Sequence, residues 1–422
     1  MTRPGNIPEA YSQPLKRQTV NWKISRYTLI AQLYFFYNAV FLPKGLLYTN
    51  ILSPLFFYQQ IRQGRKTYWP QFVLFLLVFD VFHVIKGVDL LPFVVSNLLF
   101  TSCYFLVISF YHFFNHYPHH GLLIRQLVVV NFIFAIIAIP FLFMDPDITD
   151  VLWWVNRAAL AKHEFPRLKL LTYEASYYSL LMAPVFFYYI FKYLLGQIRH
   201  NKNLTLLLVL IPVFMSLSFG VIGAGFLTGL IMLFVFRKKT LRYKRTLIIL
   251  ASLSGLLIIT ALYLWFFLPN NPVTMRMVDI VNGRDTSARG RTTDSFQMAW
   301  LIASYSNEWF GCGLGQIKIK IADVVHQHFN YWGNYARYDI PNAIGETLAI
   351  FGITGVVLRL FLQWYLFFRT RVFENYYRLA LFIFVFIYQF TGSFITNTAE
   401  YIIWALVFSK AFSQFNVQSP EA

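Results

Sequence analysis

The sequence has 422 residues, of which 57% are hydrophobic and only 13% are charged. Soluble domains carry about 25% charged residues, so this composition excludes an ordinary soluble protein and predicts an integral membrane protein. The formal net charge is +18, but the basic residues are spread over short connections between apolar segments. Lysine and arginine gather on the cytoplasmic side of membrane spans, which explains the charge without a nucleic-acid partner.

Apolar runs of about 20 residues predict membrane-spanning helices along most of the chain. Residues 1–26 form a basic tail, residues 27–414 a single polytopic membrane domain, and residues 415–422 a second short tail. The clear spans are 27–42, 45–61, 70–86, 89–111, 121–143, 173–192, 246–268, 343–368, 378–394 and 398–414.

The uncharged run from Leu204 to Phe236 is too long for one span and short for two. Basic residues flank it on both sides, so both flanks should be cytoplasmic and the number of spans between them should be even. The run is therefore predicted to be a hairpin of two short helices, with its bend near the glycines between Gly220 and Gly225.

This count gives twelve spans with both termini in the cytoplasm and an all-α fold. Two long segments face outward, residues 144–172 and 269–342. Loops as long as residues 269–342 are uncommon in compact proteins unless they have a function. The chemistry of the protein is therefore expected on the outer face, where these two loops meet the membrane.

Arg167 lies near the end of the outward segment 144–172, and Glu174 follows at the entry to the next span. The arginine offers a cation for a phosphate, and the glutamate offers a carboxylate that can accept a proton. An inverting glycosyl transfer needs both, because the leaving pyrophosphate gains negative charge while the attacking hydroxyl loses its proton. We expect Glu174 to act as the base or to position the acceptor.

The large outer loop carries further candidates for the leaving group, Arg276, Arg284, Arg289 and Arg291. The alternative is a solvated basic loop, since aspartates are available as partners. A helix with Trp300 on one face should lie in the outer interface. The run Gly311, Gly313 and Gly315 lacks the strand–helix–strand context of a dinucleotide site and predicts a tight turn instead.

Ionisable residues near the outer ends of spans are costly in a membrane and so are functional candidates. These are Asp80, His83, Glu346 and Glu400; for the two glutamates the alternative is an ordinary acid at a helix N-terminus. His326 in the large loop is a second candidate for the general base, or else a surface residue. Metal-dependent lipid-linked glycosyltransferases generally carry an acidic motif in their first outer loop. The corresponding connection here, residues 42–45, has none. We therefore expect neither a metal ion nor a cofactor.

Four segments resemble the bacterial O-antigen polymerases and O-antigen ligases. They are Arg167–Ser176, Ser216–Phe236, Ser287–Gly315 and Asn342–Gly355, the last with the paired glycines Gly352 and Gly355. The resemblance implies a membrane fold related to the GT-C glycosyltransferases and a metal-independent enzyme of the inner membrane. It also implies that Arg167 with Arg289 or Arg291 holds the pyrophosphate of an undecaprenyl-pyrophosphate-linked oligosaccharide, and that Asn342 opens the loop-exit helix.

The ligases typically carry a histidine directly before this asparagine, where the present chain has Pro341. The resemblance therefore favours a polymerase, which transfers a growing glycan onto a lipid-linked repeat unit, and it adds a chain-length regulator to the expected partners. Two alternatives remain open: a ligase that transfers the glycan to lipid A–core, and a flippase for lipid-linked oligosaccharides. The polar groups gather on one face rather than at the midplane, which argues against transport.

Overall fold

The computed structural model describes residues 48–117, 119–155, 166–198, 201–216, 218–235, 286–329 and 340–417, together with separate positions between 259 and 282. This part of the chain is mostly α-helical, with a single two-stranded ribbon among the described residues. The expected span 27–42 lies outside these residues, and so does most of 246–268. The count of twelve spans therefore stays a prediction.

Four of the described helices are long and apolar enough to cross a membrane: α3 (Trp69–Lys86), α4 (Leu90–His116), α5 (His120–Phe141) and α16 (Ala343–Arg369). Four more are apolar but shorter: α8 (Lys202–Met215), α9 (Phe219–Val235), α17 (Tyr376–Tyr388) and α18 (Thr398–Phe408). Helix α2 (Tyr48–Arg62) lies against α4. These helices confirm the coarser prediction of an all-α, membrane-embedded protein.

Helix α7 (Ala175–Leu194) contributes many of the buried side chains of the helical bundle. It lies against α8, α17 and α18, and its tyrosine hydroxyls find partners on neighbouring helices. The Tyr178 hydroxyl donates to Asn131 of α5 at 2.8 Å, and the Tyr177 hydroxyl lies 2.7 Å from the Thr398 hydroxyl of α18. Buried hydroxyls need such partners, and these bonds fix α7 relative to both neighbours.

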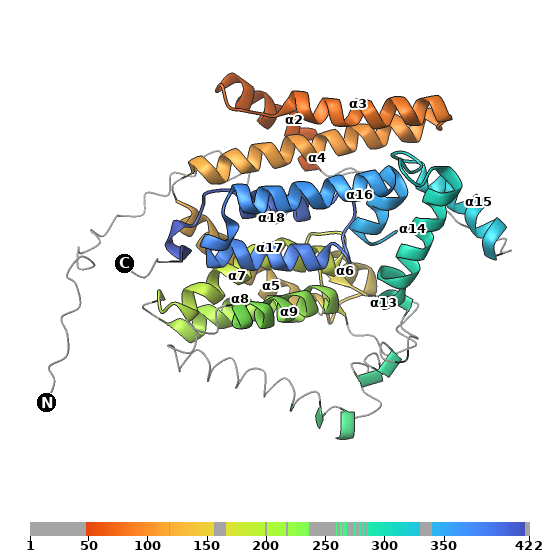
Figure 1. The fold of residues 1–422 in the computed structure, drawn as a ribbon. Helices are drawn as coiled ribbons and strands as arrows, with labels where there is room; N and C mark the ends of the chain where they lie inside the picture. Colours follow the sequence, from red (N-terminus) through yellow and green to blue (C-terminus); the bar gives the residue numbers. More distant parts are fainter. Residues whose placement is uncertain are drawn as a thin grey trace, which may run out of the picture.

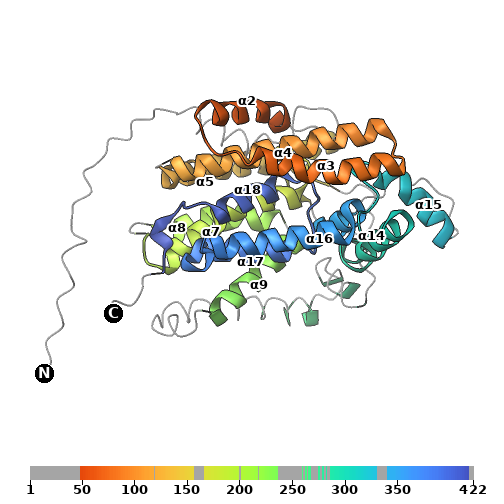
Figure 2. The ribbon, with the colours of Figure 1, turned by 45° about the horizontal axis from the view of Figure 1, so that its top comes forward.

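The segments expected to face outward lie at one end of the bundle. Helix α6 (Pro146–Leu152), α13 (Thr286–Arg291), α14 (Thr293–Ser306) and α15 (Ile317–Phe329) lie at this end, and the C-terminal turn η5 (Ser413–Phe415) lies at the other (Figure 1). Figure 2 shows α14 and α15 at the same end from a second direction. A short ribbon of β1 (Trp153–Trp154) and β2 (Arg167–Leu168) closes the first outer segment.

The run from Leu204 to Phe236 does form two helices, but the position expected for its bend was wrong. Helix α8 ends at Met215 and α9 begins at Phe219, so the glycines from Gly220 to Gly225 lie inside α9. Helix α8 lies against α5 and α7, whereas α9 lies against α17. The serine pair Ser216 and Ser218, both buried, marks the break instead.

The last two helices are also shorter than expected. Helix α17 ends at Tyr388, because the chain turns through Gln389–Ser393, and Ser393 has a positive φ of 71°. Helix α18 ends at Phe408, and the short turn η4 (Val372–Glu374) precedes α17. The loop between the two helices therefore starts deeper in the apolar run than the hydropathy indicates.

Helix α16 is interrupted at Gly352, where φ is 64° and ψ is −165°. This backbone region is open almost only to glycine. The interruption leaves the carbonyls of Ala349 and Ile350 without their usual intrahelical partners. The amides of Cys312 and Gly313 donate to these carbonyls at 2.9 and 3.0 Å.

The same loop also forms hydrogen bonds with the residues that follow the break. The amides of Ile353 and Thr354 donate to the carbonyls of Glu308 and Trp309 at 2.9 and 3.1 Å. The 308–313 loop thus pairs with two carbonyls before the break and two amides after it, in place of their intrahelical bonds. A broken helix in an apolar environment needs this replacement.

The close approach of the loop explains its glycines. A Cβ atom on Gly311 would lie 2.4 Å from the backbone of Ile350, and one on Gly352 would lie 2.4 Å from the backbone of Trp309. The expected tight turn with close backbone approach is confirmed. The partner of the turn, the interrupted helix α16, was not foreseen.

Candidate functional site

Glu174 and Arg291 form an ion pair that joins the two segments expected to face outward. Glu174 stands at the N-cap position of α7, yet its side chain makes no capping bond, and Arg291 is the last residue of α13. The Arg291 Nη2 atom lies 3.2 Å from Glu174 Oε1, with side chains 25% and 26% exposed. Both side chains of the pair are therefore partly accessible at the surface.

Asn342 fixes the backbone of Arg291. This fully buried residue caps α16, since its Oδ1 accepts the amide of Gly345 at 2.9 Å. Its Nδ2 donates to the carbonyl of Arg291 at 2.9 Å and also to the carbonyl of Phe390. One side chain thus links the end of α13, the start of α16 and the loop after α17.

The start of α9 and the end of α17 complete the surroundings of the pair. A Cβ atom on Gly220 would lie 3.9 Å from Arg291 Nη1 and 3.9 Å from the ring of Tyr388. Tyr173, whose ring centroid is 4.6 Å from that of Tyr177, lies beside the pair and is 38% exposed. Residues from all four segments singled out in the sequence therefore meet around Arg291.

The other arginines of the two loops occupy different positions. Arg289 pairs with Asp294 at 3.2 Å, and both side chains are exposed, at 57% and 44%. Such a pair stabilises a protein by less than about 1 kcal/mol and leaves the guanidinium open to other anions. Arg167 lies in β2 opposite Trp154, and β2 lies against α7 and α8.

Lys169 follows Arg167 on the same loop, and its amide donates to the carbonyl of Leu152 at 3.0 Å. Burial lowers the pKa of this lysine, and Asp150 partly offsets that effect. Arg276 and Arg284 lie outside the described residues, and His326 lies in the last turns of α15, where only the backbone is described. The roles expected for these three residues remain predictions.

Asp80 and His83 lie on α3, and His83 contacts the loop that inserts into α16. The Nε2 atom of His83 is 2.8 Å from the carbonyl of Phe310, and its buried ring would meet a Cβ atom on Gly313 at 3.1 Å. Asp80 lies beside Asn97 of α4. The contacts of His83 thus hold the 308–315 loop.

Cys312 belongs to the same loop and is buried. Burial raises the pKa of its thiol to about 12, so the residue is protonated at neutral pH. The thiolate is the reactive form of cysteine, and Cys312 is therefore suited to packing rather than to nucleophilic catalysis.

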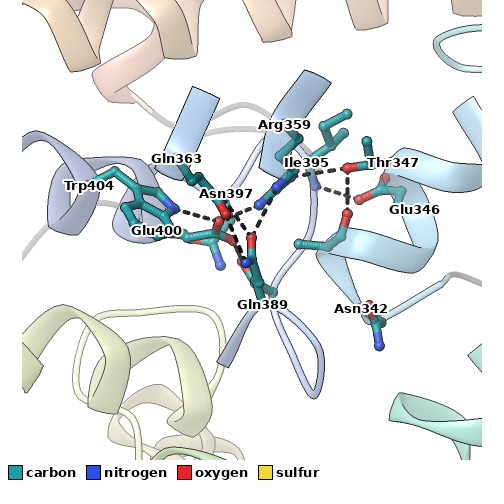
Figure 3. Close-up of polar contacts among 12 residues, drawn as sticks. Asn342, Glu346, Thr347, Arg359, Gln363, Gln389, Ile395, Asn397, Glu400 and Trp404 are labelled. Atoms are coloured by element: carbon teal, nitrogen blue, oxygen red, sulfur yellow. Dashed lines mark hydrogen bonds and ion pairs between the residues drawn. The ribbon is translucent and has the colours of Figure 1, made fainter. Parts of the chain in front are cut away.

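A second polar cluster was only half recognised from the sequence. Glu400 was a candidate, but its partner Arg359 was not, although an arginine inside an apolar helix is the signal that should have identified it. Arg359 and Glu400 form a buried ion pair, and Glu346 accepts the amide of Ile395 (Figure 3). Both glutamates lie in the first turn of their helices, as the alternative of an N-terminal acid expects, and their carboxylates also bond to groups outside those helices.

The chain matches no protein-family model and no curated protein. Among the described residues, no group of histidine, cysteine, aspartate and glutamate side chains is arranged to hold a metal ion. The geometry around Arg291 therefore carries the functional argument.

Proposed function

We propose that the chain is a polysaccharide polymerase that acts at the outer face of a bacterial inner membrane. It would transfer a growing glycan from undecaprenyl pyrophosphate onto the terminal sugar of a lipid-linked repeat unit. The observation that carries this proposal is the partly exposed pair of Glu174 and Arg291, held by Asn342 where the two segments expected to face outward meet. The resemblance in four sequence segments supplies the substrate class.

The transfer breaks the bond between the anomeric carbon of the donor glycan and the pyrophosphate oxygen. A new bond forms between that carbon and a hydroxyl oxygen of the acceptor sugar. The hydroxyl proton passes to Glu174, and the lipid pyrophosphate leaves with the bonding electron pair. Arg291 stabilises the charge that develops on the leaving group, aided by Arg289 and Arg167.

The pair is well suited to exchange partners. An ion pair that remains partly exposed contributes about 1 kcal/mol or less, whereas a guanidinium binds a phosphate through two charge-assisted hydrogen bonds. The pyrophosphate can therefore draw Arg291 away from Glu174. The freed carboxylate is then available to take the proton of the acceptor hydroxyl.

Product analysis tests this function directly. Purified full-length protein would be incubated in EDTA with lipid-linked repeat units from the same host, and the products would be separated by length. We expect a ladder spaced by one repeat unit. Unchanged repeat units from folded protein would contradict the polymerase, and transfer of a single glycan to added lipid A–core would identify a ligase instead.

A further inference from the structure

Arg359 lies in the second half of α16, inside a helix long and apolar enough to cross a membrane. Its Nε donates to Gln389 at 3.1 Å, its Nη1 to Thr347 at 3.1 Å, and its Nη2 to Glu400 (Figure 3). The side chains of Arg359 and Glu400 are only 12% and 1% exposed. A buried charge in a membrane helix is costly, and its presence points to a functional requirement.

The hydrogen bonds of the cluster suit a brace rather than a substrate site. Glu400 Oε1 accepts Trp404 Nε1 at 3.0 Å in addition to Arg359, and Oε2 accepts the hydroxyl of Ser393. The side-chain amides of Gln363 and Gln389 exchange two bonds of 2.8 and 3.1 Å. Both oxygens of Glu400 are therefore engaged by the protein itself.

Gln389 connects this cluster to the candidate site. It begins the loop 389–393, and its backbone carbonyl accepts the amide of Ile344 at 3.2 Å. In the same loop, the Gly392 carbonyl accepts the amide of Ala343 at 3.1 Å, and the Phe390 carbonyl accepts Asn342 Nδ2. The first amides of a helix lack intrahelical partners, and here the loop supplies two of them.

We propose that Arg359 and Glu400 are positioning residues for the pair of Glu174 and Arg291. The buried ion pair fixes the 389–393 loop, the loop fixes Asn342, and Asn342 holds the backbone of Arg291. The inference rests on the proposed function for its catalytic meaning. Its mechanical part, the placement of Asn342 and Arg291, is measurable without any substrate.

The decisive variant removes both charges at once, Arg359→Met with Glu400→Gln. Removing one partner of a buried pair leaves an unpaired charge, whereas neutralising both is often tolerated. The double variant should therefore unfold at nearly the wild-type temperature, while the loop loses its anchor. Arg378→Met is the matched control, because Arg378 is a buried arginine at the opposite end of α17 that bonds to the Val407 carbonyl.

Hydrogen exchange would be followed in the full-length protein in detergent. We expect the amides of residues 286–291 and 342–346 to exchange about tenfold faster in the double variant, and not in the Arg378→Met control. In the product assay, kcat should fall by about 100-fold, as for a small misplacement of a catalytic group, with a smaller change in KM.

Unchanged exchange in both segments together with wild-type turnover would overturn the inference. If the double variant does not fold, Gln389→Leu combined with Ser393→Ala takes its place, because together they remove both side-chain links between the ion pair and the loop while the charges stay paired. The two proposals fail separately. If the wild-type protein yields no product, the proposed function fails, and the exchange data still decide whether the brace holds Asn342 and Arg291.

Discussion

The protein contains two pairs of a glutamate and an arginine whose surroundings differ sharply. Glu174 and Arg291 lie 3.2 Å apart at a partly exposed junction of the two segments expected to face outward. Glu400 and Arg359 are buried among α16, α17 and α18, and both oxygens of Glu400 are engaged by protein donors. The same two functional groups are thus available for exchange with a substrate in one place and committed to the fold in the other.

Both sites contain an ion pair, so the degree of burial is what distinguishes a pair that can exchange partners from one that stabilises the fold. A partly exposed pair loses little when an anion displaces the carboxylate. A buried pair has already lost its hydration, so removing one partner leaves a charge without compensation. This difference supports the proposal that Glu174 and Arg291 take part in the chemistry while Glu400 and Arg359 position them.

The same substitution in each pair should give opposite results. Glu174→Gln removes the proposed base and should lower turnover by about 10²- to 10⁴-fold, with the free energy of unfolding changed by about 1 kcal/mol or less. Glu400→Gln leaves Arg359 buried and unpaired and should lower the free energy of unfolding by about 3–5 kcal/mol. Turnover of lipid-linked repeat units and chemical unfolding in detergent measure the two effects.

Equal losses of stability in both variants would remove the distinction between the pairs. Full turnover in Glu174→Gln would show that Glu174 is not the base.

A smaller effect is expected at the break in α16, which separates Asn342 from Arg359 within one helix. Gly352→Ala places a Cβ atom 2.4 Å from the backbone of Trp309 and forces alanine to a φ of 64°. Backbone strain and the collision together should lower the free energy of unfolding by about 2–4 kcal/mol. Gly223→Ala is the matched control, because a Cβ there meets no atom within 4 Å.

Wild-type stability in Gly352→Ala would show that the 308–313 loop is not firmly inserted into α16. Thermal unfolding in the same detergent suffices for the comparison.

The long apolar helices could be predicted because their signal is local. Helix α3 begins and ends within a residue or so of the expected span, since the run from Trp69 to Lys86 is mostly apolar despite Asp80 and His83. The break in α16 could not be placed in this way. The paired glycines were noticed, but whether a glycine interrupts a helix depends on the 308–313 loop, which is distant in sequence.

The packed face of α14 was not predicted. The helix was expected with Trp300 toward the membrane interface, and Trp300 is indeed 44% exposed, whereas Ser295, Ala299, Ile302 and Ala303 form the buried face. A large apolar residue does not mark the packed face where the surroundings are themselves apolar. Small residues allow α14 to approach α16 closely and are the better indicator here.

The candidate site shows the same division between local and distant signals. Glu174 and Arg291 were each chosen for their chemistry, but nothing in the sequence paired them across more than a hundred positions of chain. The different partners of Arg289 and Arg291 could not be predicted either, because they depend on which side of α13 each residue faces. Arg359 was overlooked because its partner, Glu400, belongs to another helix.

The most direct measurement compares Arg291→Ala with Arg289→Ala in the product assay, with both proteins shown to be folded. The two arginines lie within one turn of α13, carry the same charge and differ in partner, Glu174 or Asp294. We expect Arg291→Ala to lower turnover by about 10²- to 10³-fold and Arg289→Ala by less than about tenfold. Long chains made at the wild-type rate by Arg291→Ala would contradict the assignment of this site.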